Sequence, residues 1–264
     1  MAGYKKRQFS KSSTAYIALG VVLIAVMTIA GTSAFMKTNG FIVTGASAYT
    51  AEEVVEASGI SIGDNLLFIN SQAASQSIRE ALPFISSVEI TRRLPDTVNI
   101  VITESIAVAY IHFAGDYYII DSSGRVLDRS RNSEAAMSMI TDKKLIEIRG
   151  VEIEETVIGR NLRPVFGTET KLQYMQDVLI GLEREGLQGD VTYLDVSNIV
   201  NVHFEFMKKF TVIFRGTTNL RPNNLRHSLS NLAGDVVKVE QQFPHSPGEI
   251  IFDETGQARF YPKH

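Results

Sequence analysis

The chain has 264 residues, a formal net charge of −3, and neither Cys nor Trp. The absence of cysteine excludes a disulfide framework, a thiol nucleophile and a thiolate metal site. All four charges before residue 37 are positive, so residues 37–264 hold 22 basic and 29 acidic residues and a net charge of −7. This acidic balance argues against binding to nucleic acid or anionic lipid through bulk charge.

An uncharged apolar segment, Ala15–Met36, follows a short basic tail. As a helix its 22 residues would be about 33 Å long, enough to cross the hydrocarbon core of a bilayer. The basic residues that precede it predict that the N-terminus stays in the cytoplasm. We therefore expect residues 1–14 to be a cytoplasmic tail, residues 15–36 to be a single transmembrane helix in the cytoplasmic membrane, and the rest to be extracytoplasmic.

Two other interpretations of this segment are weaker. A cleaved signal peptide would use the small residues Thr32 and Ala34 at positions −3 and −1, but the apolar run exceeds the usual length of about 7–15 residues. A buried core helix would have a polar face, and this segment has none.

Residues 37–105 predict a compact α/β unit. Thr50 with Glu53 three residues later forms a capping-box pattern, and Gly59 ends that helix. A second helix, capped by Asn70 or Ser71, stops at Pro83. The predicted strands and buried run are Phe41–Gly45, Leu66–Ile69, Ser87–Arg92 and Val98–Thr103. We expect the order βααββ, with both helices on one face of a small sheet and the other face solvated.

This order and its motifs resemble the POTRA domain of the bacterial cell-division proteins FtsQ and DivIB. The resemblance covers about 65 residues without a gap and includes the stretches FIVTG, NLLFIN, LPFISSVEI and RRLPDTVNIVITE. Its matching positions are Phe41, Val43, Gly45, Ala57, Gly59, Ile60, Gly63, Asn65, Leu66, Pro83, Phe84, Ile85, Val88, Arg92, Leu94, Pro95, Val98, Ile100, Val101 and Glu104. The resemblance sets the POTRA boundaries at residues 37–105.

Residues 106–264 predict a mainly antiparallel β domain with two helices, which makes the whole chain α+β. The DSSG turn at Asp121–Gly124 again resembles the start of the second domain of FtsQ and DivIB. One helix should run from Thr168, as its cap, to Glu185, and the other from Leu220 to Ala233. The predicted strands are 108–113, 117–120, 125–127, 145–149, 191–196, 200–206, 210–215, 249–253 and 258–261, and residues 132–144 are expected to be a loop or a short helix.

Motifs for catalysis, metals or cofactors do not appear in the sequence. The five histidines, at positions 112, 203, 227, 245 and 264, lack metal-ligand spacing. Ser47 lacks the second glycine of a nucleophile elbow, and Asp121 and Asp195 are typical of turns. We therefore expect no catalytic residue, no metal, no cofactor and no enzymatic activity.

A surface for protein partners is the remaining expectation. The strand Ala258–Tyr261, followed by Pro262, is a candidate sheet edge that could accept an added strand. The family resemblance implies partner contacts at the last strands, which here are Ile250–Asp253 and Ala258–Tyr261. The candidate partner-binding residues are Ile251, Phe252, Arg259, Phe260 and Tyr261.

The resemblance also implies the partners and the place of action. It implies a divisome scaffold at the division septum that binds small coiled-coil membrane proteins of the FtsB/DivIC and FtsL type and helps recruit and regulate the septal peptidoglycan synthase. Two alternatives remain open: another POTRA-bearing membrane protein, such as a transport component, and a tethered cell-wall enzyme.

Overall fold

The computed structural model describes residues 16–25, 27, 31, 36–131, 133–216, 221–253 and 256–263. The chain forms two compact units. The first unit contains Met1–Ile78 and Ser87–Thr103, and the second contains Arg79–Ser86 and Glu104–His264.

Residues 16–25 are helical. The predicted cytoplasmic tail, residues 1–14, lies outside the described residues, as do positions 15, 26, 28–30 and 32–35 of the predicted transmembrane helix. Within the described part of the chain, no helix combines the length and apolarity needed to cross a membrane.

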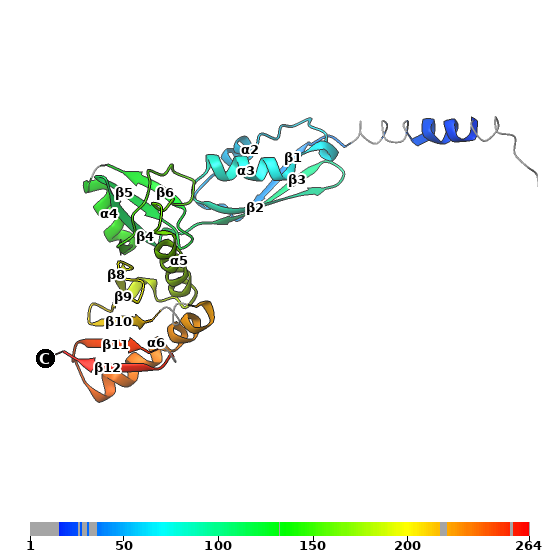
Figure 1. Ribbon diagram of the computed structural model, residues 1–264. Helices are drawn as coiled ribbons and strands as arrows, with labels where there is room; N and C mark the ends of the chain where they lie inside the picture. The colour runs from blue at the N-terminus through cyan, green and yellow to red at the C-terminus, as the bar shows by residue number, and fades with distance from the viewer. Residues whose placement is uncertain are drawn as a thin grey trace, which may run out of the picture. The chain divides into compact units, whose positions relative to one another are not determined.

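The first unit has a three-stranded sheet in the order β1-β3-β2, and β1 runs parallel to β3. Its elements are β1 (Gly40–Thr44), α2 (Ala51–Ser58), the 3₁₀ turn η1 (Leu66–Phe68), α3 (Ser71–Ala81), β2 (Ile85–Arg93) and β3 (Thr97–Glu104). The end of α3 and the start of β2, within residues 79–86, are assigned to the second unit. Helices α2 and α3 lie along one face of this sheet (Figure 1). The predicted order βααββ is confirmed.

Local chemistry starts and stops these helices as predicted. The Glu53 N–H donates to Thr50 Oγ1 at 3.3 Å, and the Thr50 N–H donates to Glu53 Oε2 at 2.8 Å, which completes the capping box. Gly59 ends α2 with a φ of 67°, a left-handed conformation that glycine adopts without a steric cost. The Ala73 N–H donates to Asn70 Oδ1 at 3.0 Å, so Asn70 caps α3.

The prediction of a buried run at Leu66–Ile69 was wrong at its centre. Leu66 is fully buried, but 45% of Leu67 and 76% of Phe68 are exposed. The reason is that Asn65 Oδ1 accepts the Leu67 N–H at 2.9 Å and starts a 3₁₀ turn in place of a strand. A turn with three residues per revolution directs only one side chain in three toward the core.

The second unit has a nine-stranded sheet in the order β12-β11-β10-β9-β8-β7-β4-β5-β6. Five of its eight strand pairs are antiparallel, and the pairs β10–β11, β7–β8 and β4–β7 are parallel. The strands are β4 (Ala109–Phe113), β5 (Asp116–Ile120), β6 (Val126–Ser130), β7 (Ile146–Arg149), β8 (Val191–Asp195), β9 (Asn201–Phe206), β10 (Phe210–Arg215), β11 (Gly248–Phe252) and β12 (Ala258–Pro262).

The described helices that cover this sheet are α4 (Ser133–Lys143), α5 (Glu169–Arg184) and α6 (Pro222–Gln242). Helices α5 and α6 were predicted, and α4 lies where a loop or a short helix was expected. Helices α5 and α6 bury their leucines against the larger core, which includes Tyr118 and Ile120. Helix α4 packs with Ile119 in a separate cluster. Because successive residues of a strand point to opposite faces, α4 covers the other side of the sheet from α5 and α6.

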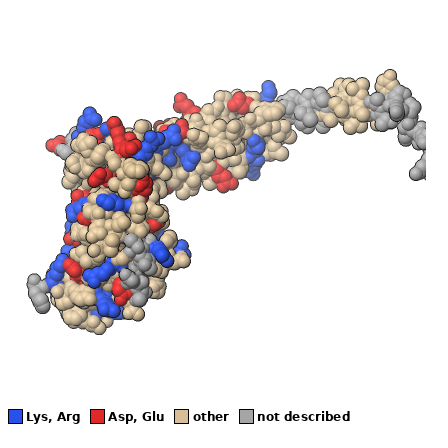
Figure 2. Space-filling model, in the orientation of Figure 1, with Lys and Arg blue, Asp and Glu red and all other residues tan. Residues whose placement is uncertain are grey.

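Two helix predictions need correction. Helix α6 extends nine residues beyond Ala233, because Val236 continues the buried stripe of Leu225, Leu229 and Leu232. Thr168 stands at the start of α5 but makes no side-chain cap; its hydroxyl donates to the Val165 carbonyl at 2.7 Å instead. Figure 2 shows acidic and basic side chains interspersed on the visible face of this unit.

Candidate partner-binding edge

Strand β12 is the outermost strand at one end of the nine-stranded sheet. It pairs antiparallel with β11, with Ile250 opposite Phe260 and Ile251 opposite Arg259. No described strand pairs with its other side. The predicted strand at Ala258–Tyr261 therefore lies at a sheet edge, where an extended peptide could add.

The hydrogen bonds at the two ends of this hairpin show which backbone groups face outward. The Lys263 N–H donates to the Pro247 carbonyl at 2.9 Å, and the Asp253 N–H donates to the Gln257 carbonyl at 3.1 Å. Bonding directions alternate along an antiparallel strand, so Arg259 and Tyr261 bond toward β11. The N–H and C=O groups of Ala258 and Phe260 consequently face away from the sheet.

The side chains of Arg259 and Tyr261 are exposed on one face of the edge. Tyr261 is 48% exposed, and Arg259 reaches Asp253 with an ion-pair distance of 3.4 Å. Lys263 lies 3.1 Å from Glu249 on the neighbouring strand. Tyr261 and Arg259 thus offer an aromatic ring and a guanidinium group, which are common at the centres of protein interfaces.

Phe260 points to the opposite face, toward α6. Its ring centroid lies 5.3 Å from that of Phe243 and 6.0 Å from that of Phe210. Gly248 lies directly beneath the ring, and a Cβ atom at that position would overlap both Phe260 and the Tyr261 carbonyl. Phe260 therefore holds β12 against the core and contributes mainly its backbone to the outer edge.

The two predicted residues on β11 lie inside the unit. Phe252 is 1% exposed and stacks on Phe214 at a centroid distance of 5.4 Å. Ile251 is also buried, opposite Arg259. Because its ring is packed in the core, the side chain of Phe252 offers no surface to a partner. The structure thus brings Arg259, Phe260 and Tyr261 to the edge and keeps Phe252 in the core.

A mainly polar groove of about 690 Å³ runs between α6 and the inner side of β12. His227, Asn231 and Asp235 line it from the helix, and Ala258 and Phe260 line it from the strand. The Asn231 side-chain amide donates to the His227 carbonyl at 2.9 Å, and Asp235 pairs with Lys238 at 2.9 Å. The sequence did not predict this groove, because it forms only when the β10–α6–β11 crossover brings α6 beside β12.

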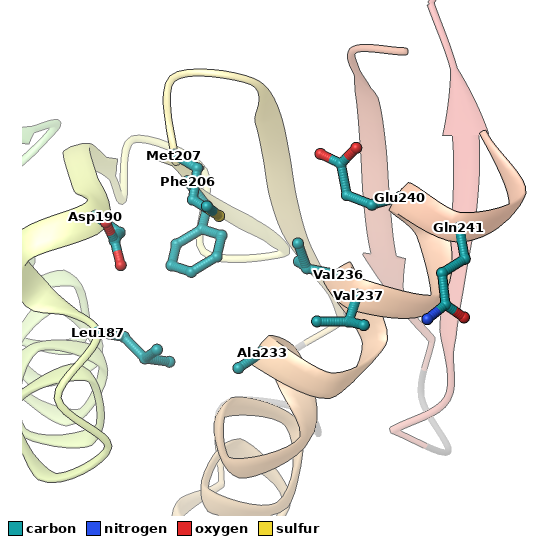
Figure 3. Close-up of a pocket in the computed structure, with 9 residues that line it drawn as sticks. All are labelled: Leu187, Asp190, Phe206, Met207, Ala233, Val236, Val237, Glu240 and Gln241. Carbon is teal, nitrogen blue, oxygen red and sulfur yellow. The ribbon is translucent and has the colours of Figure 1, made fainter. Parts of the chain in front are cut away.

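An apolar pocket of about 480 Å³ lies at the other side of α6, between that helix and residues 187–207 (Figure 3). Leu187, Phe206 and Val236 form its walls, and the carboxylates of Asp190 and Glu240 stand on opposite sides. Lys209 bonds to Glu240 and lowers the pKa of its carboxyl below the usual value. The lining residues include no histidine or hydroxyl side chain that could serve as a base or nucleophile.

The described residues contain no cluster suited to a metal ion. None of their His, Asp and Glu side chains gather in groups of three or more that could hold an ion. At the C-terminal sheet edge the chain presents outward-facing backbone groups and the exposed side chains of Arg259 and Tyr261.

Comparisons with known proteins extend over both units. The family model "POTRA domain, FtsQ-type" matches residues 36–105, which include strands β1–β3 and helices α2 and α3. The cell division protein DivIB of Clostridium botulinum strain Hall is 25% identical over 210 residues, 80% of this chain and 75% of the relative. DivIB of Clostridium acetobutylicum is 27% identical over 188 residues, 71% of this chain and 70% of the relative.

Over most of its length the chain is similar to the FtsQ and DivIB cell-division proteins, and residues 36–105 match their type of POTRA domain. A further relative, the cell division protein FtsQ of Corynebacterium glutamicum, is 35% identical over 112 residues, 41% of this chain and 50% of the relative. The DivIB alignments are much longer than the 70-residue POTRA match, so the FtsQ/DivIB likeness reaches into the nine-stranded sheet.

Proposed function

We propose that this FtsQ/DivIB-like protein is a non-enzymatic, membrane-anchored scaffold of the divisome at the septum. It binds small coiled-coil division proteins of the FtsB/DivIC and FtsL type and helps recruit and regulate the septal peptidoglycan synthase. Residues 15–36 are its anchor, and residues 37–105 and 106–264 are its POTRA and β domains.

The single observation that supports a binding role is the outward-facing backbone of β12. Ala258 and Phe260 each offer one N–H and one C=O in strand geometry, with Arg259 and Tyr261 exposed beside them. A partner strand added here would gain backbone hydrogen bonds for affinity and side-chain contacts for specificity. Pro262 lacks an N–H group and limits such an added strand to the four residues before it.

The test replaces Ala258 by Pro in the full-length protein. Proline at this position removes an outward donor and blocks an added strand sterically, while the hydrogen bonds from β12 to β11 remain. We expect binding to purified detergent-solubilised FtsB/DivIC-type and FtsL-type partners to weaken by about tenfold or more, ~1.4 kcal/mol. The separate variants Arg259→Ala and Tyr261→Ala test the two side chains.

The matched control is Phe166→Ala, which removes an aromatic side chain of the same unit that is 95% exposed and lies outside the edge. It should bind as the unmodified protein does. Unchanged thermal unfolding of Ala258→Pro shows that its sheet is intact. Full-strength partner binding by a folded Ala258→Pro variant would refute strand addition at β12.

A further inference from the structure

The exposed apolar side chains of the three-stranded unit are concentrated at one end. Among residues 36–78 and 87–103, the most exposed large apolar side chains are Phe68, Ile62, Leu94 and Leu67, with exposed fractions of 76, 71, 60 and 45%. The remaining two, Ile42 and Val101, are 36 and 39% exposed and lie on the sheet.

These four side chains surround the point where the chain enters the unit. The Leu66 N–H donates to the Met36 carbonyl at 2.9 Å, and the Gly63 N–H donates to the Thr38 carbonyl at 2.7 Å. The Asn39 N–H donates to the Asp96 carbonyl at 2.8 Å. The loops with residues 61–68 and 94–96 are therefore fastened to residues 36–39, directly after the apolar segment 15–36.

Basic side chains gather at the same end. Lys37, Arg92 and Arg93 are exposed, and Arg92 also donates to the Ile69 carbonyl at 2.6 Å beside Phe68. Figure 2 shows Lys and Arg side chains where the chain enters this unit. The two carboxylates here accept neutral hydrogen bonds: Asp64 from the Ser61 N–H at 2.8 Å, and Asp96 from the Asn39 amide at 3.3 Å.

We infer that this end of the POTRA unit is a second membrane contact, in which Ile62, Leu67, Phe68 and Leu94 enter the lipid interface. The inference rests on the proposed anchor, because an anchor that leaves the bilayer at Met36 holds loops bonded to residues 36–39 at the headgroup level. Apolar side chains framed by Lys and Arg suit that boundary, where lipid tails meet negatively charged headgroups. The negative charge of residues 37–264 as a whole does not oppose it, since screening confines charge effects to about 10 Å.

Single-cysteine variants can test this contact because the natural chain has no cysteine. The full-length protein is reconstituted into vesicles of phosphatidylethanolamine and phosphatidylglycerol, with bimane attached at Phe68→Cys, Val101→Cys or Val22→Cys. Val101 is the matched control. It lies on β3 four residues after Thr97, the partner of Gly40, and is therefore about 13 Å along the strand from Thr97. Val22 reports on the anchor itself. Quenching is measured with nitroxide-labelled lipids and, separately, with aqueous iodide.

The inference predicts that lipid nitroxides quench the probes at positions 22 and 68 but leave the probe at position 101 unchanged. Quenching at 22 without quenching at 68 would overturn the membrane contact and leave the anchor standing. An unquenched probe at 22 would remove the anchor and the inference together. A probe at 68 that is shielded from iodide but not quenched by lipid would identify a protein contact in place of the bilayer, and this result also overturns the inference.

Discussion

At the scale of single residues, Asp116 is a buried carboxylate in the sheet of the second unit that two arginines hold. It is buried at the start of β5 and accepts a hydrogen bond from Arg129 at 2.7 Å and one from Arg131 at 3.0 Å. Arg129 also reaches Glu155 at 2.8 Å. The bonds from Arg131 and Arg129 lower the pKa of Asp116 below its ordinary value, because they stabilise the charged form.

The lowered pKa predicts a stability that declines in acid. In the unfolded chain an aspartate titrates near ~3.9, so the contribution of Asp116 is complete above that pH and is lost as pH falls through the lower, folded-state value. We expect the stability difference between the natural protein and Asp116→Asn to be largest at neutral pH and to shrink below about pH 4. Urea denaturation from pH 7 to pH 2.5 in detergent measures it. A difference that stays constant with pH would contradict this assignment.

Residues whose role depends on near neighbours in the sequence were predictable. The capping box of Thr50 and Glu53 needs only a spacing of three residues, and the structure has it. The burial of Phe252 depends on a distant partner and could not be read from the sequence, and the outward turn of Phe68 was missed although its cause, Asn65, lies only three residues earlier. Phe252 is covered by Phe214 of a strand nearly forty residues earlier, whereas Phe68 turns outward with the 3₁₀ turn.

At the scale of elements, the β11–β12 hairpin depends on the contact between Gly248 and the ring of Phe260. Glycine lets the two strands approach closely while the ring covers the backbone opposite Pro262. Phe243, just after α6, packs on the same ring. The position of the edge strand is thus linked to the end of the helix that crosses over the sheet.

We predict that Gly248→Ala destabilises the second unit and displaces β12. The added methyl group overlaps Phe260, and overpacking of this kind costs about 1–3 kcal/mol. Gly234→Ala is the matched control, because it lies in α6 with no neighbouring atom within 4 Å and should gain up to about 1 kcal/mol of helix stability. Urea midpoints and amide exchange of residues 258–261 measure both effects. Equal stability of the two variants would show that the contact is dispensable.

Strand positions followed from alternation in the sequence, but the sheet order did not. The segments predicted at residues 249–253 and 258–261 are β11 and β12 within one or two residues. Their neighbours depend on the parallel pairing of β11 with β10 across α6, which no local pattern encodes. The proposed edge was therefore predictable as a strand, whereas the outward direction of the Ala258 and Phe260 backbone groups required the register.

At the scale of the whole molecule, the distribution of charge predicts the orientation in the membrane. All charges before residue 37 are positive, and the remainder carries −7. We expect a membrane-impermeant maleimide to label Phe166→Cys in intact spheroplasts and to label Ser10→Cys only after lysis. Labelling of Ser10→Cys alone in intact spheroplasts would reverse the proposed topology. Equal labelling of both variants before lysis would indicate leaking membranes. A cytoplasmic protein with a free thiol, labelled in the same sample, is the control for leakage.

The parallel pairing of β1 with β3 has a mechanical consequence. Five residue pairs, from Gly40 with Thr97 to Thr44 with Val101, join the strand that enters from the proposed anchor to the strand that leads on to the nine-stranded sheet. A pull on the start of β1, opposed by a load on the end of β3, shears all these hydrogen bonds at once, since parallel strands carry such forces along their common axis. Bonds loaded together resist far more force than bonds that open one after another, so this short ladder is suited to bearing tension between a membrane and the proteins attached beyond it.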